Sequence, residues 1–175
     1  FNVNEGKKYT INNVNIIGEI PFEENIYINI LENLKKQTYS QAQVTSIEEF
    51  FVDVLGNRGY AFAEVKGDTE TIDDSNQVDL TFAVIPGKKT YTRKIMFTGN
   101  YVTQDEVLRR EMRQFEGAWS SNNSIEAGKV RLERLGYFKE VNVETIPVVG
   151  TEDQIDIVYS VEEETTGSVG GNLGY

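Results

Sequence analysis

The side chains that most often carry acid–base and nucleophilic chemistry are missing from this sequence, which contains no histidine and no cysteine. Without cysteine there is no thiol nucleophile, zinc–thiolate centre or iron–sulfur cluster. Without histidine, the commonest general base and metal ligand is absent. An enzyme built on this sequence would depend on carboxylate, lysine or tyrosine chemistry. Carboxylate pairs such as Glu162 and Glu164 have no neighbour in the sequence that would give them different acid and base roles.

The acidic run Asp73–Asn76 suggests a calcium loop at first sight. An EF-hand loop that begins at Asp73 would need glycine at its sixth position and glutamate at its twelfth, where Val78 and Val84 stand. The run is better interpreted as a solvated hairpin loop. We therefore expect no catalytic residue, no metal ion and no cofactor. The alternative is a carboxylate-based hydrolase, which would need two carboxylates about 5–10 Å apart in a cleft.

Charge limits the possible partners. The chain has 17 basic and 28 acidic side chains and a net charge of -11, which argues against a nucleic-acid binder because such proteins neutralise phosphates. The basic residues concentrate in the second half, at Lys88, Lys89, Arg93 and Lys94 and then at Arg109, Arg110 and Arg113. This asymmetry indicates either different contacts for the two halves or ordinary solvated faces.

An internal repeat organises the chain. Gly6–Gly18 aligns with Gly87–Gly99 at an offset of 81 residues, and both segments begin with the letters GKK. Further along, Val78–Val84 aligns with Ile155–Val161 at an offset of 77 residues. The sequence therefore predicts two copies of a unit of about 80 residues. Residues 1–6 align with the end of the first copy, which predicts that they are the last strand of a preceding repeat.

Each copy is predicted to contain a strand, two helices and two further strands, in the order β-α-α-β-β. The strands are identified by apolar residues that alternate with polar ones. These residues are Val14, Ile16, Val78, Leu80, Phe82 and Val84 in the first copy, and Ile95, Phe97, Ile155, Ile157, Tyr159 and Val161 in the second. The predicted fold class is α+β, with two tandem units that each pack a three-stranded sheet under a helix pair.

The helices are predicted from apolar stripes with helical spacing. In the second copy, Thr103 and Glu106 form a capping box, and the stripe that follows is Leu108, Met112 and Phe115. In the first copy, Ser46 with Glu49 is a possible start of the second helix. The other stripe residues are Ile26, Ile30, Leu31 and Leu34, then Ile47, Phe51, Val54 and Leu55, and in the second copy Ile125, Leu132 and Leu135.

Three motifs in the second copy resemble a known family. They are RKIMFTGN (Arg93–Asn100), VLRREMRQFEGAW (Val107–Trp119) and RLGYFKEV (Arg134–Val141). Together with the β-α-α-β-β order, they resemble the POTRA (polypeptide-transport-associated) domain, in the form that lies next to the membrane barrel of outer-membrane protein assembly factors. The resemblance covers essentially the whole chain. It implies that residues 7–87 are the fourth POTRA domain and residues 88–164 the fifth.

The resemblance also implies a function and a location. Such a chain would be the periplasmic part of an outer-membrane protein of Gram-negative bacteria, in which it would bind accessory lipoproteins and nascent barrel strands during their insertion. It would not be an enzyme. The POTRA region of another outer-membrane secretion or import transporter is the alternative.

The tail of the chain, residues 165–175, fits this placement. Val169, Leu173 and Tyr175 fall on one face of an extended segment, and small or polar residues fall on the other. This alternation is typical of a transmembrane β-strand. It predicts the start of the first strand of a C-terminal membrane barrel, with a glycine-rich tail of no fixed structure as the alternative.

A charged surface is expected on the first helix of the second copy. Beside the apolar stripe, Arg109, Arg113 and Glu116 would form a polar stripe on the same helix. The resemblance implies that this helix binds an accessory lipoprotein, BamD, and that these three residues are the contacts. Arginine suits such a role because its planar group makes paired, charge-assisted hydrogen bonds. The alternative is pairing within the helix, between Glu106 and Arg110.

The second expected surface is a sheet edge. The strand after the helix pair is expected to lie at the edge of each sheet, where an unfolded client could add a strand by backbone hydrogen bonds. The residues assigned to this edge are Ala63 and Val65 in the first copy and Val141 and Val143 in the second. The alternative is an edge that is closed or covered.

Overall fold

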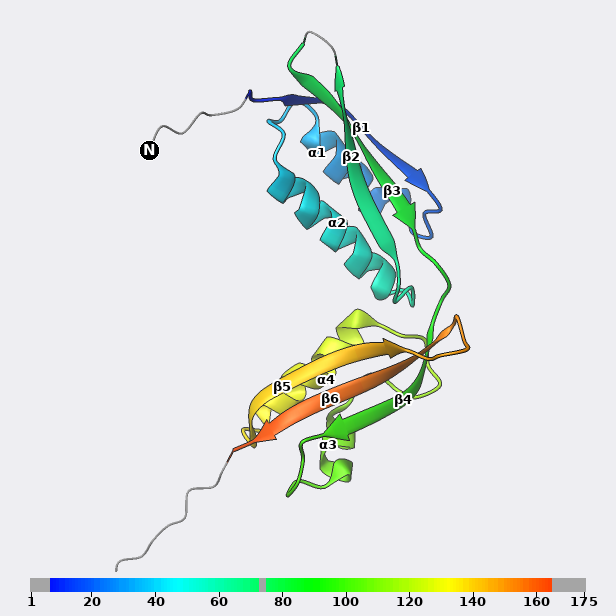
Figure 1. Ribbon diagram of the computed structural model, residues 1–175, viewed down its shortest axis with the longest axis vertical. Helices are drawn as coiled ribbons and strands as arrows, with labels where there is room; N and C mark the ends of the chain where they lie inside the picture. Colours follow the sequence, from blue (N-terminus) through cyan, green and yellow to red (C-terminus); the bar gives the residue numbers. More distant parts are fainter. Residues whose placement is uncertain (1–6, 73–74, 165–175) are drawn as a thin grey trace, which may run out of the picture. The chain divides into compact units, whose positions relative to one another are not determined.

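The computed structural model describes residues 7–72 and 75–164, which form two compact units that divide between Lys89 and Thr90 (Figure 1). The predictions of a preceding repeat at residues 1–6 and of a barrel strand at residues 165–175 lie outside the described residues. Within the described ranges, none of the helices combines the length and the apolar character that crossing a membrane requires.

The first unit packs its helices on one face of a three-stranded sheet. Its elements are β1 (Thr10–Gly18), the short 3-10 helix η1 (Glu24–Ile26), α1 (Ile28–Leu34), α2 (Gln41–Gly56), β2 (Glu64–Ile72) and β3 (Gln77–Ile85). The strand order is β1-β3-β2, with β1 parallel and β2 antiparallel to the central strand β3. A parallel pair needs a crossover, and here the helices supply it.

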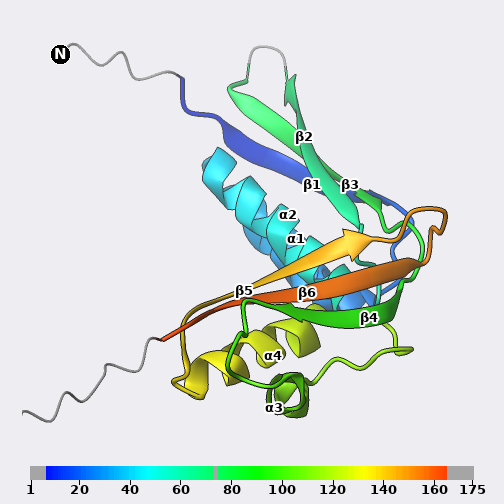
Figure 2. The same ribbon diagram turned by 60° about the horizontal axis from the view of Figure 1, so that its bottom comes forward.

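The second unit repeats this arrangement. Its elements are β4 (Tyr91–Thr98), α3 (Asp105–Glu111), α4 (Asn122–Arg134), β5 (Phe138–Pro147) and β6 (Gln154–Glu163). The strand order is β4-β6-β5, with β4 parallel and β5 antiparallel to the central strand β6. Figure 2 shows α3 and α4 on the same side of this sheet. The predicted α+β class with two β-α-α-β-β units is confirmed.

The central strand of each sheet supplies the core. Val78, Leu80, Phe82 and Val84 of β3 are all buried, and so are Ile155, Ile157, Tyr159 and Val161 of β6. Each fully buried side chain of this size stabilises the fold by about 1.5–3 kcal/mol relative to an exposed one. The alternation in the sequence therefore predicted the buried face of both central strands correctly.

The predicted start of α2 is wrong. The helix begins five residues before Ser46, after the extended residue Ser40, and Ser46 lies inside it. The Ser46 hydroxyl donates to the carbonyl of Ala42, one turn earlier in the helix, at 3.0 Å. Serine can satisfy its hydroxyl in this way within a helix, so its presence does not mark a helix start.

The predicted extent of α3 is also wrong. The helix starts after Gln104 without a side-chain cap, and it ends at Glu111, so Met112 is extended and Phe115 is 64% exposed. The buried amide of Gln114 explains this ending, because it donates to the carbonyl of Trp119 at 2.9 Å and accepts from the N–H of Ser121 at 3.1 Å. These bonds hold the chain in a loop where a longer helix was expected.

Repeat-equivalent positions fill the two cores differently. In the first unit the rings of Phe51 and Phe82 meet edge to face, with their centroids 5.8 Å apart. The equivalent residues in the second unit are Gly128 and Tyr159, and a Cβ on Gly128 would lie 2.7 Å from the tyrosine hydroxyl. That hydroxyl donates to the carbonyl of Ile125 at 2.8 Å, and its burial raises the pKa of Tyr159.

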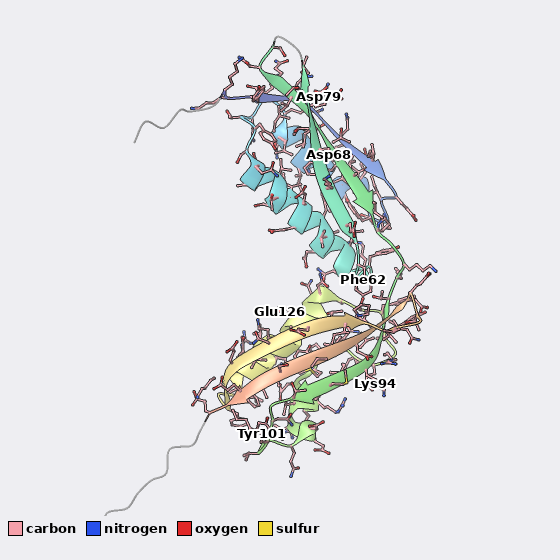
Figure 3. All side chains as sticks on the ribbon, in the orientation of Figure 1. Phe62, Asp68, Asp79, Lys94, Tyr101 and Glu126 are labelled. Atoms are coloured by element: carbon pink, nitrogen blue, oxygen red, sulfur yellow. The ribbon has the colours of Figure 1, made fainter. Side chains whose placement is uncertain are left out.

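A carboxylate on the central strand holds a bulge in the first strand of each unit. The bulge in β1 lies between Ile11 and Val14, where Asp79 (labelled in Figure 3) accepts from the Asn12 side chain at 2.8 Å and from the Asn13 N–H at 3.0 Å. Both contacts tie β1 to β3 at the point where their regular pairing is interrupted.

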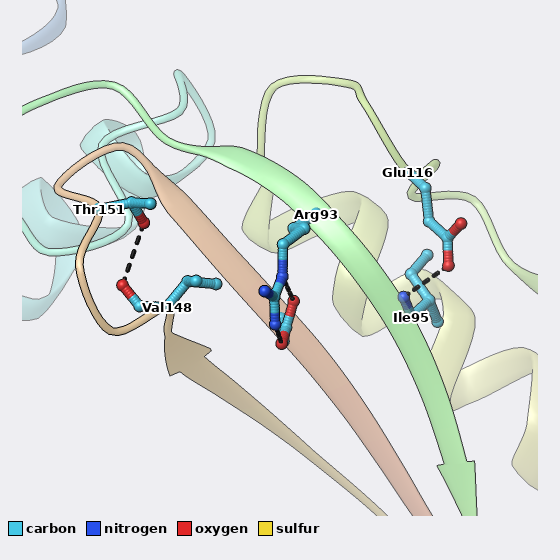
Figure 4. A network of polar contacts seen from close by, with 6 residues as sticks. Arg93, Ile95, Glu116, Val148 and Thr151 are labelled. Carbon is cyan, nitrogen blue, oxygen red and sulfur yellow. Dashed lines mark hydrogen bonds and ion pairs between the residues drawn. The ribbon is translucent and has the colours of Figure 1, made fainter.

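The equivalent carboxylate in the second unit is Asp156, which holds the β4 bulge between Thr92 and Lys94. Asp156 accepts from Arg93 Nε at 2.8 Å and also from Arg93 Nη2 (Figure 4). The hydrogen bond from Arg93 lowers the pKa of Asp156 below its ordinary value. Asp156 is 7% exposed, so losing this partner would leave a nearly buried charge without compensation.

A glycine lies at the end of the first strand of each unit, where the backbone passes close to the central strand: Gly18 is the last residue of β1, and Gly99 directly follows β4. Gly18 and Gly99 have φ angles of 103° and 84°, in the left-handed region. A Cβ would lie 2.1 Å from the carbonyl oxygen of Val84 at Gly18, and 1.9 Å from that of Val161 at Gly99. Both positions therefore require glycine for conformation and for space.

We predict that Gly99→Ala destabilises the protein more than Gly117→Ala. Gly117 also has a positive φ angle, 80°, but a Cβ there would meet no atom within 4 Å. The strain at Gly117 should lower the free energy of unfolding by about 1–2 kcal/mol. Gly99→Ala should lower the free energy of unfolding by roughly 1–3 kcal/mol more than Gly117→Ala, because its Cβ would overlap the carbonyl oxygen of Val161. Urea unfolding of both variants checks this, and equal losses would contradict the close contact with Val161.

We predict that Asp156→Asn lowers stability at neutral pH and that this loss shrinks in acid. A carboxylate whose pKa is lower in the folded state adds stability above its unfolded pKa of about 3.9. That contribution disappears as the pH falls through the lower, folded pKa. Urea unfolding at pH 7 and at steps below about pH 4 should show the two proteins converging. A difference that stays constant with pH would rule out the charged pair as its cause.

Candidate functional site

The edge of β4 brings Arg109 and Glu116 together. Arg109 lies on α3, and Glu116 lies in the loop between α3 and α4. The N–H of Ile95 donates to Glu116 Oε1 at 2.8 Å, and Arg109 Nη2 donates to the carbonyl of Ile95 at 3.0 Å (Figure 4 shows the Glu116 bond). The two side chains also pair with each other, Arg109 Nη1 to Glu116 Oε1, at 3.4 Å.

These contacts close part of an exposed sheet edge. β4 is an outer strand, so the backbone groups that face away from β6 need partners. Before Ile95, the backbone of Thr92 donates to the carbonyl of Ala118 at 2.9 Å and accepts from the N–H of Gly117 at 2.7 Å. At Ile95 the two charged side chains take the place of a neighbouring strand.

A shallow cavity of about 270 Å³ lies beside this edge. Its lining residues are Ile95, Arg109, Met112, Gln114, Phe115 and Glu116. The side chains of Arg109 and Glu116 are 48% and 46% exposed, so both charges are accessible to solvent. The guanidinium of Arg109 also lies 5.3 Å from the ring centre of Phe97, a position that holds it in place. An apolar floor with one group of each charge suits an anchoring side chain of a protein partner.

The structure brings together two of the three residues predicted for lipoprotein binding. Arg109 and Glu116 share the cavity, whereas Arg113 is exposed and does not line it. The predicted polar stripe along one helix is wrong, because α3 ends at Glu111. Sequence reasoning also missed Gln114, which is 3% exposed and shapes the loop. Gly117, with its positive φ angle, was the available signal that the helix stops before this point.

The strands assigned to client binding do lie at sheet edges. β2 and β5 are outer strands in their sheets, as expected. Of the assigned residues, Ala63 is buried one position before β2, Val141 is buried, and Val65 and Val143 are partly buried. Their side chains therefore contribute to packing, and the edge itself is formed by the backbone of each strand.

The two edges differ in how they are covered. In β2 the N–H of Gly67 donates to Glu48 of α2 at 2.6 Å, so this outward group already has a partner. A Cβ on Gly67 would lie 2.6 Å from Val44 of α2, which shows how closely the helix approaches. In the second unit the position of Glu48 is taken by Ile125, whose side chain cannot accept a hydrogen bond.

Among residues 7–72 and 75–164, no group of three or more acidic side chains is placed to hold a metal ion. The described residues do offer a charged cavity beside β4 and the outer backbones of β2 and β5. A second cavity lies on β5 and β6, lined by Glu140, Asn142, Ser160, Val161 and Glu162. Both kinds of feature are suited to binding other polypeptides.

Comparison with known proteins identifies the repeated unit. The family model described as POTRA, surface antigen variable number repeat, matches residues 9–87 and again residues 90–164. The outer membrane protein assembly factor BamA of Neisseria meningitidis serogroup B is 32% identical over 174 residues, 99% of this chain and 22% of that protein. BamA of Buchnera aphidicola is 34% identical over 175 residues, 99% of this chain and 28% of that protein.

Solved structures agree with this result. The crystal structure of Haemophilus influenzae BamA POTRA3-5 matches with a TM-score of 0.82 and 33% identity, over 89% of this chain and 61% of that one. BamA from Haemophilus ducreyi lacking POTRA domains 1-3 matches with a TM-score of 0.77 and 38% identity, over 90% of this chain and 30% of that one. The chain spans less than a third of the curated relatives described above. The resemblance drawn from the sequence motifs is thus confirmed, and the chain belongs to the POTRA family.

Proposed function

We propose that this chain is a periplasmic scaffold of the machinery that folds and inserts β-barrel proteins into the outer membrane. One observation carries the proposal. Four relatives named outer membrane protein assembly factor BamA are 28–34% identical to this chain over 99–100% of its length. The chain would act by holding partners, with no chemical step of its own.

The two units are proposed to be the fourth and fifth POTRA domains of such a factor. The Haemophilus ducreyi structure lacks domains 1-3, yet it matches 90% of this chain. The three-domain POTRA3-5 structure is matched over 61% of its length, close to two domains of three. In this assignment residues 1–6 end the third domain and residues 165–175 begin the first barrel strand.

The cavity beside β4 is proposed as the binding site of an accessory lipoprotein, BamD. Glu116 accepts from Ile95 and pairs with Arg109, so a basic side chain of the partner would compete with contacts inside this domain. Arg113 is exposed on the adjoining loop and would contribute a charged contact at the rim. Because the charges are half exposed, this binding should weaken as the salt concentration rises.

The outer backbone of β5 is proposed to bind client strands. Strand addition uses backbone hydrogen bonds, so it accepts many sequences, as a scaffold for varied clients requires. Val141 and Val143 lie within β5, and Ala63 and Val65 mark the corresponding edge at β2. Since Glu48 already occupies the Gly67 N–H, β2 should bind clients less readily than β5.

We predict that Arg109→Glu and Glu116→Lys each weaken BamD binding at least roughly tenfold, about 1.4 kcal/mol, in the full-length protein. Each change reverses one charge in the cavity and breaks the Arg109–Glu116 pair. The matched control is Arg110→Glu, which makes the same charge change at an exposed neighbour on α3 that does not line the cavity. Binding is measured by titration at low and high salt, with circular dichroism to check folding.

Unchanged affinity in both cavity variants would refute the site while leaving the family assignment intact. If the wild-type full-length protein captures no accessory lipoprotein at all, the chain is better explained by the alternative function, as the POTRA region of a different outer-membrane transporter. Equal weakening by Arg110→Glu would show that only net charge matters.

We predict that client strands crosslink more strongly to β5 than to β2. A photo-crosslinking residue in place of Glu144 on β5, or of Asp68 on β2, reports the two edges from exposed positions. In the full-length protein Glu48→Ala should raise crosslinking at the Asp68 position, because it removes the acceptor of the Gly67 N–H. Glu48→Gln, which keeps an acceptor oxygen, should not. Equal crosslinking at both edges in the wild type would disprove the proposed difference.

A further inference from the structure

The loop between β4 and α3 exposes two apolar side chains almost completely. Tyr101 is 94% exposed and Val102 is 87% exposed, far more than most large apolar side chains of this protein. Figure 3 labels Tyr101 on this loop, at the end of the sheet of the second unit. Single exposed apolar residues are common, but two adjacent ones at a loop tip suggest a contact surface.

The loop is held in this conformation by Glu163, the last residue of β6. The Glu163 carboxylate accepts from the N–H of Thr103 at 2.7 Å and from the N–H of Val102 at 3.0 Å. These bonds, led by the one from Thr103, lower the pKa of Glu163, so the carboxylate stays charged at neutral pH. Asn100 adds a bond from its side chain to the carbonyl of Thr103 at 2.9 Å. The exposure of the two apolar residues is therefore built into the fold.

The position of the loop follows from the parallel pairing of β4 and β6. Parallel strands end on the same side of a sheet, so the loop after β4 lies beside the point where β6 finishes. A third exposed apolar residue, Tyr137 at 53%, is tied to the same point, because its carbonyl accepts from the N–H of Glu164 at 2.9 Å. Tyr101, Val102 and Tyr137 therefore lie at the same end of the sheet as Glu163 and Glu164.

The chemistry of this end fits the water–lipid boundary. Residues 98–104 carry no charge, although the chain as a whole has a net charge of -11. Tyrosine combines an apolar ring with a polar hydroxyl, and it is enriched where membrane proteins meet the headgroup region. Glu162, Glu163 and Glu164 lie nearby, so attraction to anionic lipids cannot be the basis of the contact.

We propose that Tyr101, Val102 and Tyr137 form an interfacial contact with the lipid headgroup region of the membrane that holds this protein's barrel. The inference rests on the proposed function, in which residues 165–175 begin the first barrel strand. Each residue after Glu164 spans at most about 3.6 Å, so the first few residues of that strand keep this end close to the bilayer. The contact limits how far the second unit swings away from the membrane.

The test places a fluorescent NBD label at Tyr101→Cys in the full-length protein, with no other reactive thiol. The protein is reconstituted into phosphatidylcholine bilayers with and without nitroxide-labelled lipid. The matched control is Val149→Cys, at a residue that is 99% exposed in the turn before β6. β6 has 10 residues, so this turn lies about 30 Å from the Glu163 end of the strand.

We expect the nitroxide lipid to remove most of the fluorescence at position 101 and little at position 149, at low and high salt alike. A label at Tyr137→Cys should be quenched as well, and Tyr101→Ser with Val102→Ser should reduce that quenching. Equal quenching at 101 and 149, or none at either, overturns the proposal. A blue-shifted but unquenched label at 101 also overturns it, because protein would then cover the loop.

The same preparation separates this inference from the proposed function. Capture of the accessory lipoprotein BamD is measured on the reconstituted wild-type protein. Capture without quenching at position 101 refutes the lipid contact alone. No capture by the wild-type protein refutes the proposed function, whatever the label reports. Quenching at position 101 without capture still supports the lipid contact, because the POTRA region of another outer-membrane transporter would also adjoin a membrane barrel.

Discussion

The parallel pairing of the first and last strands of each unit determines where its other parts lie. Because β1 runs parallel to β3 and β4 to β6, the chain must cross over between them, and the helices that form the crossover cover one face of each sheet. The remaining strand of each unit, β2 or β5, pairs on the other side of the central strand and is therefore an outer strand. An aspartate on each central strand, Asp79 or Asp156, secures the pairing at a bulge.

A sheet with two outer strands must protect some of its edge and can offer the rest. At β4 the loop after α3 supplies backbone partners, and at Ile95 the side chains of Arg109 and Glu116 complete the closure. The same two charges remain half exposed beside a cavity, so one pair of residues protects an edge and presents a charged surface. The proposed scaffold role depends on this combination, since partners would bind without a deep pocket.

Periodic features could be predicted from the sequence, and features set by single side chains could not. The alternation of Val78, Leu80, Phe82 and Val84 predicted a buried strand face because burial of that face requires it. The apolar spacing of Met112 and Phe115 predicted a longer helix, but the buried amide of Gln114 bonds to Trp119 and Ser121 instead. Arg109 and Glu116 meet for a different reason than predicted, since the loop returns Glu116 to β4.

Hydrogen–deuterium exchange of the full-length protein tests the central claim most directly, because it reports backbone edges themselves. If the chain is a scaffold that binds through its edges, adding the accessory lipoprotein should slow exchange in residues 109–118, and adding an unfolded barrel client should slow exchange in β5. Exchange in α2, which lies on the covered face of the first unit, should stay the same. Protection confined to the helices, or none in either segment with both partners present, would contradict the account.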